Sequence, residues 1–533
     1  MKKWYGLLII ILILSLLLFP ACAAPSSPAT KAAPSTPATA TTAKPQYGGV
    51  LKIIARLSMS QLGAPAEGST SYQCYASPAM QDLIRQDRNW HPLTTKSTLI
   101  ESFDVAPDGK TMTLRLRQGV KFHDGTACNA EAVKYNMQNY APNKVVPSQL
   151  KNITAYNVID DYTLKLNFNE FDPYFLSILA RGATGIMASP AALKVTSTPE
   201  NIAKDHMVGT GAFKFVSWQR ENYIKYEKWA GYWEQGKPYL DAIEFNQVID
   251  PVTSLISFKK GEAQVIVGIT PKEANDLKAA GYQIVISDTM PPIACLTPDG
   301  GNPNSPWANK KAREAMEYAI DKKAIADGFG VGYYTAVNQF AAPGDERNVA
   351  ALAGRSYDPA KARQLMTEAG YPNGFKTRLI GQTSYDRDLM VAIQTYLNAV
   401  GINTELDIAD ANRFSTFYRE GWENGIMMQP QIGMNLSGMR MYLGAIGNST
   451  LTYKSSYRPA GWVDKVNQAI AIVDDSKRLV QEKELVKMLS DEAIAIPLYS
   501  SCFLVAQDKS VQGLDWGWCH NYVYEPQNAW LSK

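Results

Sequence analysis

The chain has 533 residues, more than one compact core usually holds, so two or three domains are expected. Hydrophobic residues make up 46% of it and aromatic residues 10%, which is enough for large buried cores. Its 53 Lys and Arg nearly balance its 50 Asp and Glu, and this balance argues against a dedicated nucleic-acid-binding protein, which normally carries a clustered basic excess.

Residues 1–21 have the layout of a secretory signal. Lys2 and Lys3 form a short basic region, and an apolar stretch then leads to Ala21 and Cys22. This end resembles a bacterial lipobox, in which Cys22 is lipidated and becomes the mature N-terminus. The alternative is an uncleaved membrane anchor, because the apolar stretch is nearly long enough to span a bilayer. Both alternatives place the rest of the chain outside the cytoplasm.

The next segment, residues 22–46, is rich in Ala, Pro, Ser and Thr and has no aliphatic side chain larger than Ala after Cys22. Such a composition cannot bury enough apolar surface to offset the entropy of ordering it. We therefore expect a lipid-anchored tether with a span of about 25–30 Å, lengthened further by its prolines.

Five cysteines follow Cys22, so at least one of them is unpaired unless two chains are cross-linked. The closest pair in sequence, Cys502 and Cys519, is a candidate disulfide, and no C-x-x-C motif occurs.

Apolar runs and alternating patterns predict strands in the first half of the body. An Asp-Gly pair at Asp108-Gly109 joins two of them and is a hairpin signal. Helices are predicted over 78–86 and 130–139. The predicted strands cover residues 50–54, 99–105, 111–122, 162–168 and 212–218.

The second half is richer in helix signals. Asn309 caps a predicted helix over 310–327 that ends at Gly328, and Asp358 caps the next, which ends at Gly370. Further helices are expected over 389–400 and 463–489. Because strands and helices mix without a regular βαβ repeat, we expect an α/β protein with modules in more than one lobe.

Signals for an enzyme are weak. No H-E-x-x-H, G-x-S-x-G or P-loop motif occurs among these residues. His123-Asp124-Gly125 lies between a strand and a helix, where turn chemistry is needed, and it is interpreted as structural. The chain is therefore expected not to be an enzyme and to need no cofactor or metal. Two alternatives stay open: a secreted hydrolase with a dispersed site, and a ligand sensor or chaperone.

From Tyr47 to the C-terminus the chain resembles family 5 of the bacterial extracellular solute-binding proteins, the peptide-, nickel- and haem-binding components of ABC importers. Blocks in matching order carry the resemblance: 117–125 followed by 130–133, 209–213, 232–241, 261–263, 319–321, 357–363 and 369–372.

The resemblance implies a two-lobed, periplasmic-binding-protein-like fold of the large cluster C type, whose lobes close over a ligand by hinge motion. Lobe I would comprise 47–76, 206–290 and 495–533, with an inserted subdomain over 77–205. Lobe II would comprise 291–494, and the ligand would lie between the lobes near the crossings at about 290 and 495. The expected partners are a small or peptide-like ligand, ABC permease subunits and the membrane, and the chain is expected to act as a monomer.

The resemblance also places candidate ligand contacts. Relatives present loop residues where this chain has Tyr72, Gln73 and Tyr75, although loop packing explains these residues equally well. The pocket segment of lobe II corresponds to 425–435, where peptide-binding relatives carry an Asp and this chain has no carboxylate. This segment carries side-chain amides and a thioether instead, and Cys295 falls where some relatives have a cysteine. The candidate ligand contacts of lobe II are therefore Cys295, Gln429, Gln431, Met434 and Asn435.

The methionines of this segment favour adaptable core packing, with an apolar pocket wall and soft-metal or haem ligation as alternatives. Because a buried ammonium group needs a carboxylate partner, an uncharged or amphipathic ligand is expected unless a distant acid such as Glu67 enters the cleft.

Overall fold

The computed structural model describes residues 44–56, 59, 62–63, 75–86, 91–140, 148–170, 172–180, 185–287, 292–432, 453–514 and 525–533. Residues 45–533 form one compact unit. The predicted signal segment, Cys22 and nearly all of the predicted tether lie outside the described residues, as does Cys519. None of the helices in the described ranges combines the length and apolar character that a bilayer crossing requires.

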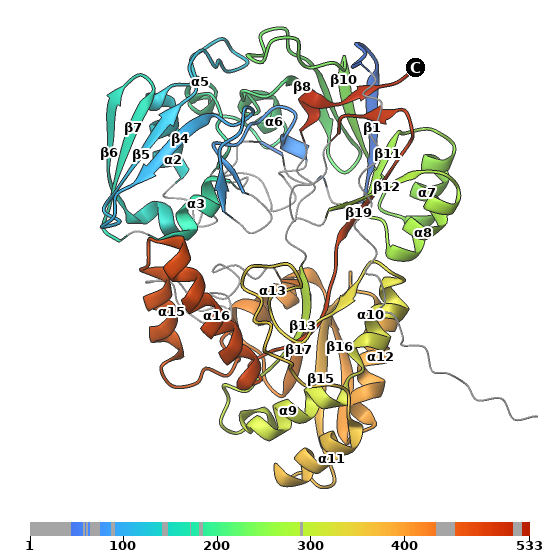
Figure 1. Ribbon diagram of the computed structural model, residues 1–533. Coiled ribbons are helices and arrows are strands. Elements are labelled where there is room, and N and C mark those ends of the chain that lie inside the picture. Colours follow the sequence, from blue (N-terminus) through green and yellow to red (C-terminus); the bar gives the residue numbers. More distant parts are fainter. Residues whose placement is uncertain are drawn as a thin grey trace, which may run out of the picture. The chain divides into compact units, whose positions relative to one another are not determined.

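The first sheet has the strand order β12-β19-β11-β1-β10-β9-β8 (Figure 1). Its central strand β1 is buried on both faces, as its continuous apolar run predicts: Leu51 and Ile53 pack into one core cluster, and Ile54 packs into another beneath two helices. The strands are β1 (Val50–Ala55), β8 (Phe213–Gln219), β9 (Tyr223–Lys228), β10 (Ala242–Gln247), β11 (Val265–Val267), β12 (Gln283–Ser287) and β19 (Phe503–Gln507), and the helices are α7 (Pro251–Lys259) and α8 (Pro271–Ala279).

An inserted subdomain between β1 and β8 has its own sheet, in the order β4-β5-β7-β6. The Asp108-Gly109 turn joins β4 to β5, with Gly109 at a φ of 67°, so the predicted hairpin is confirmed. The elements are β2 (Arg85–Gln86), β3 (Pro92–Leu93), β4 (Ile100–Val105), β5 (Thr111–Leu116), α2 (Ala130–Tyr140), β6 (Ile153–Asp160), β7 (Thr163–Phe168), α3 (Tyr174–Leu179), α5 (Pro190–Leu193) and α6 (Ile202–His206).

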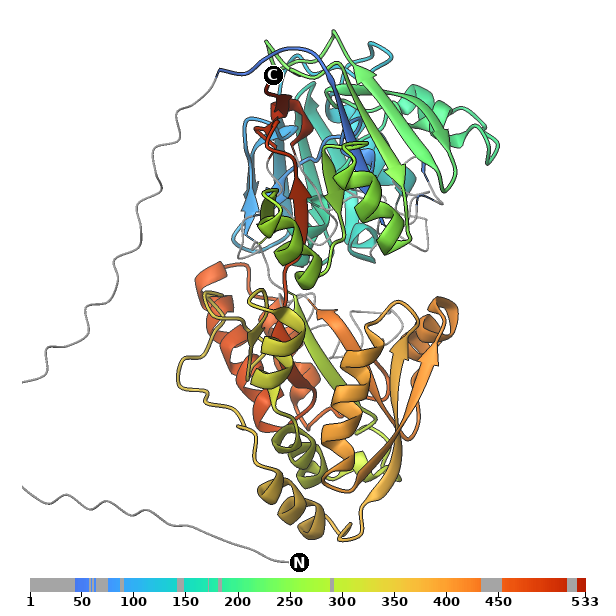
Figure 2. The ribbon, with the colours of Figure 1, turned by 90° about the vertical axis from the view of Figure 1, so that its right-hand side faces the viewer.

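The second sheet has the order β14-β18-β13-β17-β15-β16, with helices on both faces (Figure 2). The strands are β13 (Ile293–Pro298), β14 (Thr335–Ala336), β15 (Phe375–Gln382), β16 (Ile402–Ala409), β17 (Gly425–Ile432) and β18 (Ile496–Ser500). The helices are α9 (Lys310–Ala319), α10 (Lys322–Gly330), α11 (Pro359–Glu368), α12 (Arg387–Asn398), α13 (Ala411–Glu420), α15 (Trp462–Ile470) and α16 (Asp475–Asp491). Near the C-terminus, β20 (Val511–Gln512) and β21 (Trp530–Leu531) form a two-stranded antiparallel sheet.

We call the first sheet with its helices the first lobe and the second sheet with its helices the second lobe. The chain crosses between them after β12 and again between β18 and β19. The expected boundary at 495 assigns β18 to the first lobe, whereas β18 pairs with β13 and β14 of the second sheet. The second crossing therefore lies at Ser501 and Cys502.

Three helix predictions differ from the structure. Residues 78–86 are a turn followed by the short strand β2, because their apolar side chains are buried all round and their backbone pairs with neighbouring loops. The predicted helix 310–327 is two helices: Ile320 is extended, and Asp321 caps α10 by accepting from the amide of Ala324. Residues 463–489 likewise form two helices, with Asp474 as the second cap.

Candidate functional site

The first sheet directs the carboxyl ends of three strands toward the crossings. Strands β11 and β19 pair antiparallel, with Val267 opposite Val505. Because β19 starts just after the second crossing, the end of β11 lies beside that crossing. Strands β1 and β10 run parallel to β11 and reach the same edge.

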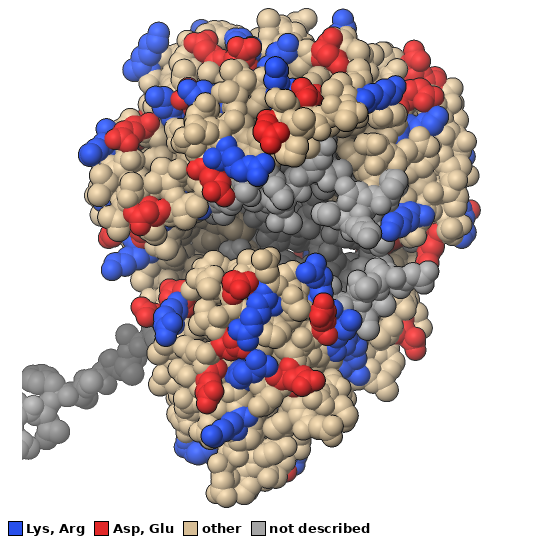
Figure 3. Space-filling model, turned by 180° about the vertical axis from the view of Figure 1, so that it is seen from behind, with Lys and Arg blue, Asp and Glu red and all other residues tan. Residues whose placement is uncertain are grey.

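The second sheet has the matching arrangement. Strand β13 starts just after the first crossing and pairs antiparallel with β17, so that Ile293 lies opposite Ile432. Strand β15 is parallel to β17 and to β16, so all three carboxyl ends lie at the edge nearest the crossings. Ligands of open α/β sheets bind outside the carboxyl ends of the strands. The space between the two edges is therefore the candidate site, and the surface is hollowed at this level (Figure 3).

The two crossings hold each other. The Ser501 amide donates to the Pro292 carbonyl at 2.8 Å. Beside them, Tyr333 of the second lobe packs against the first-lobe cluster under α7 and α8, and the Asn275 side-chain amide donates to the Val331 carbonyl at 3.0 Å. A pair of crossings held in this way suits hinge bending, because only a few backbone angles must change.

Helix N-termini also point toward the two edges. Asp386 and Asp410 cap α12 and α13 after β15 and β16 by accepting from backbone amides. In the first lobe, Asp250 caps α7, and Thr270 forms a capping box with Glu273 at α8. The side-chain oxygens of these caps satisfy the exposed amides of the helix ends, so these ends are already occupied by groups of the chain.

Arg56 follows β1 at the same edge. Its guanidinium pairs with Glu273 at 2.7 Å and donates to the Ser254 hydroxyl at 2.8 Å, and only 8% of its side chain is exposed. Its charge is therefore compensated inside the first lobe.

The predicted contacts are only partly covered by the structure. Tyr75 is 1% exposed: its ring meets Phe245 edge-on at 5.3 Å, and its carbonyl accepts from the Tyr226 hydroxyl at 2.5 Å. In this structure Tyr75 is a core residue of the first lobe. The predicted contacts that lie outside the described residues are Tyr72, Gln73, Met434 and Asn435.

Cys295 and Gln429 are brought together, since they are register partners in β13 and β17. Cys295 is fully buried, and Gln429 is 8% exposed. Gln431 lies two residues farther along β17, nearer the carboxyl edge. Of the methionines, Met427 and Met428 are fully buried and pack into the clusters on opposite faces of the sheet, as core packing requires.

His123 has a structural environment. It is 8% exposed, its Nε2 hydrogen-bonds with the Gly211 carbonyl at 2.9 Å, and its ring meets Trp229 edge-on. Burial lowers its pKa to about 4, so the ring is neutral near pH 7. The neighbouring Asp124 accepts from Thr126 and Ser189, which is the turn chemistry that the sequence indicates.

Several residues around this site were not predicted from the sequence. Asp386 and Asp410 each follow a strand and precede a helix, and this strand–Asp–helix pattern is a signal that could have placed them at the carboxyl edge. Tyr333 has no comparable signal, because only the tertiary structure brings it against the first lobe.

Two cavities lie away from the edges. One of about 780 Å³ is lined by α2 and α5 of the inserted subdomain, and one of about 350 Å³ lies in the second lobe. Within the described ranges, no group of three or more His, Cys, Asp or Glu side chains is placed to hold a metal ion.

Comparison with known proteins gives a family. Residues 94–449 match the model described as bacterial extracellular solute-binding proteins, family 5 Middle. Glutathione-binding protein GsiB of Salmonella typhi is 35% identical over 353 residues, and that of Pectobacterium atrosepticum is 34% identical over 322 residues. The matches cover 64% and 60% of this chain and 66% and 61% of the relatives, so this chain spans slightly less than two thirds of their length.

Solved structures share the fold over nearly the whole chain. The binding protein AgaA in complex with agropinic acid, from A. tumefaciens R10, has a TM-score of 0.76 and 23% identity, covering 91% of this chain and 99% of its own. The substrate-binding protein CtaP of Listeria monocytogenes has a TM-score of 0.77 and 20% identity, covering 92% and 100%. These two-lobed proteins confirm the expected fold class.

Proposed function

The chain belongs to family 5 of the bacterial extracellular solute-binding proteins, and from this membership we propose that it is the extracytoplasmic substrate-binding component of an ABC importer. The observation that carries the proposal is the pair of facing carboxyl edges joined by two crossings. A ligand held between them contacts both lobes only when the lobes close, and this differential contact drives closure. The closed form then delivers the ligand to membrane permeases.

The proposal places the protein at the membrane through a lipid on Cys22, with residues 22–46 as the tether. Replacing Cys22 with Ser should release the body into the soluble extracytoplasmic fraction or leave an uncleaved precursor. Mature protein that stays with membranes and keeps residues before Cys22 would contradict the lipid anchor and favour the uncleaved anchor.

The proposal makes the chain a binding protein rather than an enzyme. His123, the histidine of the motif that most resembles an acid–base pair, is buried, neutral and hydrogen-bonded to a backbone carbonyl. Its neighbour Asp124 is engaged by Ser189 and Thr126. These contacts support a structural role for the pair.

The ligand that fits the two edges best is uncharged or amphipathic. The pocket segment 425–435 has no carboxylate, and the edge carboxylates Asp386 and Asp410 already accept backbone amides. Among these described carboxylates a buried ligand ammonium would therefore lack a partner, which is costly, unless an acid such as Glu67, which lies outside the described residues, enters the cleft. Glutathione, which the named relatives bind, carries such an ammonium group and is the informative probe.

Small-angle scattering and thermal unfolding test the proposal together. A ligand should reduce the radius of gyration and raise the melting temperature, because it binds the folded, closed state. Neutral amides and oligosaccharides should act at lower concentration than glutathione. Micromolar glutathione binding that is lost on acetylation of its amino group would overturn the selectivity and leave the transport role intact. Stabilisation by every active ligand without compaction would overturn hinge closure.

A further inference from the structure

Tyr385 follows β15 at the carboxyl edge of the second sheet. Its amide donates to the Gln382 carbonyl at 2.9 Å, which turns the chain back toward the last residue of β15. The Tyr385 ring packs against the core clusters on both faces of the sheet, so it lies across the end of the sheet rather than on one face. Tyr385 is therefore part of the edge that faces the candidate ligand site.

The ring of Tyr385 is held in place by its neighbours. It meets Phe414 of α13 edge-on, with the ring centres 5.5 Å apart. Gly381 packs beside it, since a Cβ added there would lie 3.4 Å from Cδ2 of the ring. Because these contacts fix the direction of the side chain, little entropy is lost when its hydroxyl meets a ligand.

The hydroxyl of Tyr385 is placed differently from the ring. It makes no hydrogen bond with the residues that the structure describes, and solvent reaches it. Burial raises the pKa of Tyr385, and the neighbouring Cys295 adds to the rise, so the hydroxyl stays protonated at neutral pH. The edge therefore presents an O–H donor that the described protein does not use.

Two neighbouring polar side chains of the same turn are engaged within the chain. The Ser384 hydroxyl donates to Oε1 of Gln382 at 2.6 Å. Asp386 caps α12 by accepting backbone amides. Tyr385, which lies between Ser384 and Asp386 in the sequence, has no contact of this kind.

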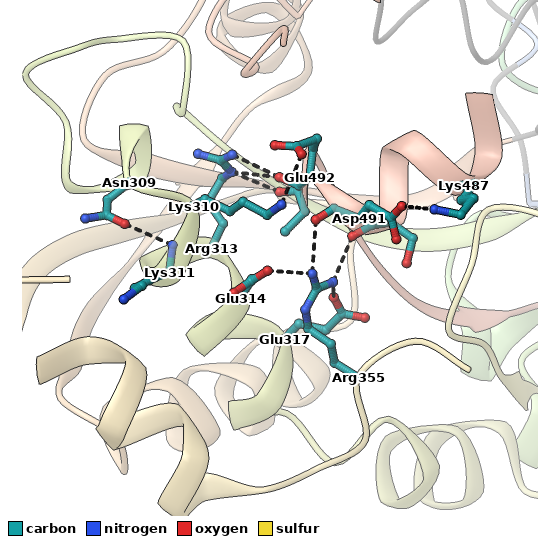
Figure 4. Close-up of polar contacts among 12 residues, drawn as sticks. Asn309, Lys310, Lys311, Arg313, Glu314, Glu317, Arg355, Lys487, Asp491 and Glu492 are labelled. Atoms are coloured by element: carbon teal, nitrogen blue, oxygen red, sulfur yellow. Dashed lines mark hydrogen bonds and ion pairs between the residues drawn. The ribbon is translucent and has the colours of Figure 1, made fainter. Parts of the chain in front are cut away.

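Buried polar groups elsewhere in the second lobe show what such contacts look like (Figure 4). Arg313 is 1% exposed and donates to the Glu492 carbonyl at 2.9 Å. Glu317 is also 1% exposed and accepts from Arg355 at 2.9 Å. Partners of this kind are the rule for polar groups near a core, so the unengaged hydroxyl of Tyr385 calls for a partner from outside the chain.

Gln429 lies on the neighbouring strand β17, level with the end of β15. Ile380 of β15 is the register partner of Met427, and continuing this register places the last residue of β15 beside Gln429. Because side chains alternate along a strand, Gln429 points to the same face as Met427, whose cluster the Tyr385 ring also contacts. Gln429 is 8% exposed, and its amide has no hydrogen-bond partner among the described residues although solvent reaches it.

The Tyr385 hydroxyl and the Gln429 amide together complement an uncharged carboxamide. A carboxamide has a carbonyl oxygen with two lone pairs and an NH₂ group with two donors. It can therefore exchange two hydrogen bonds with the Gln429 amide and accept a third from the Tyr385 hydroxyl. A carboxylate in the same place would receive no cation from either side chain, and burying an unpaired charge is costly.

We propose that Tyr385 is a specificity-determining ligand contact which, with Gln429, selects a solute that carries an uncharged carboxamide group. The inference rests on the proposed transport function, because it assigns chemistry to the ligand site of that function. It narrows the uncharged ligands expected at the two edges to those that both donate and accept hydrogen bonds through one planar group.

Calorimetry of the full chain with three matched probes tests the carboxamide preference. The probes are N-acetyl-leucinamide, N-acetyl-leucine methyl ester and N-acetyl-leucine. The amide should bind about tenfold more tightly than the ester, which lacks the N–H donors, and the negatively charged acid should bind more weakly than both. Equal affinity for the amide and the ester, or no binding of the amide, would overturn the preference.

Two variants separate the two contacts. Tyr385→Phe should weaken both the amide and the ester about tenfold, because both probes keep the carbonyl that accepts from the hydroxyl. Gln429→Met should reduce the advantage of the amide over the ester to about twofold or less, because the acceptor of the N–H group is gone. Tyr396→Phe is the matched control: it removes a hydroxyl near the far end of α12 and should bind all three probes like the unaltered protein.

The melting temperature of the unliganded protein tells a ligand contact from a structural role. Tyr385→Phe should leave it unchanged, because the hydroxyl has no partner to lose. If Tyr385→Phe binds the amide like the unaltered protein, the inference fails, and compaction of both proteins by the same amide would leave the transport function standing. If no neutral ligand binds or compacts the unaltered protein, the transport proposal itself fails.

Discussion

The two lobes contact each other on two sides, and the chemistry of the two contacts differs. On the side of the crossings, α8 and α10 are neighbours, and Tyr333 packs on the first-lobe core (Figure 1). On the opposite side, the inserted subdomain meets the second lobe through His91, whose Nε2 is 2.9 Å from Oε1 of Glu346, and through Val473. We call these the hinge contact and the rim contact.

The hinge contact is made by backbone groups and apolar packing, whereas the rim contact is led by one histidine–carboxylate contact, which is an ion pair only when His91 is protonated. The His91 and Glu346 side chains are 38% and 25% exposed, and exposed pairs contribute only about 0–1 kcal/mol. The Pro292 carbonyl and Ser501 of the hinge are buried. Under the proposed hinge motion, we therefore expect the lobes to stay joined at the hinge contact while the rim contact opens and closes.

The largest expected effect is at the hinge. Replacing Ser501 with Pro removes the amide that donates to the Pro292 carbonyl and leaves that carbonyl buried without its donor. We expect the free energy of unfolding to fall by about 2–3 kcal/mol. Urea denaturation followed by tryptophan fluorescence measures the change.

Ser501→Ala is the matched control. It keeps the amide and loses only the 3.4 Å contact from the hydroxyl to the same carbonyl. A change within about 0.5 kcal/mol is expected. Equal losses in the Pro and Ala variants would show that the hydroxyl, and not the backbone bond, holds the crossings together.

Much of the fold was predictable because its signals are local. The apolar run of β1, the alternation of β5 and the caps Asn309 and Asp358 depend on neighbouring residues, and each is found in the structure. The helix predicted over 78–86 was wrong because long-range contacts decide that segment. The amide of Gly211 donates to the Ala79 carbonyl, more than a hundred residues away in the sequence.

The candidate site was less predictable for the same reason. The register that pairs Cys295 with Gln429 and the approach of Tyr333 to the first lobe arise from tertiary structure. Four of the predicted contacts lie outside the described residues and stay predictions. The burial of Tyr75 could not be derived from its loop-like sequence, because its neighbour Phe245 comes from β10.

The next largest effect is expected from the pH dependence of stability that the buried Asp82 contributes. Arg85 begins β2, which pairs with β3 just after His91, and Asp82 lies three residues before β2 in an isolated bridge with Ile186. Burial raises the pKa of Asp82 to about 7, against an opposing effect of Arg85 and a reinforcing effect of Glu525. Folding therefore favours the protonated acid, and its contribution to stability is complete below about pH 4 and is lost as the pH rises toward 7.

His123 contributes a pH dependence of stability opposite to that of Asp82. Its pKa is lowered to about 4, so the unfolded chain binds more protons between about pH 4 and 6.5, and stability rises with pH there. Asp82→Asn should remove the loss of stability that the Asp82 carboxyl causes as the pH rises. The free energy of unfolding of the variant should therefore rise between pH 5 and 7, by about 2 kcal/mol relative to the unaltered protein. Denaturation curves at pH 5, 6 and 7 measure this; parallel pH profiles for the two proteins would contradict it.

The smallest expected effect on stability is at the rim itself. Glu346→Gln keeps the shape of the side chain and removes the charge that pairs with His91, while Arg347 retains Asp345 at 3.0 Å and Glu482 at 2.7 Å. The free energy of unfolding should change by less than about 1 kcal/mol, because the pair is partly exposed. The unliganded protein should nevertheless expand in small-angle scattering, since the pair spans the two lobes.

Glu368→Gln is the matched control, because it removes the same charge from an exposed pair with Lys311 that lies within the second lobe, at 2.8 Å. It should change stability as little as Glu346→Gln does and leave the radius of gyration unaltered. Expansion in both variants would mean that net charge, rather than the rim, sets the opening. A loss well above 1 kcal/mol in Glu346→Gln alone would mean that the rim is a fixed interface, and the lobes could not part there without unfolding the hairpin that carries His91.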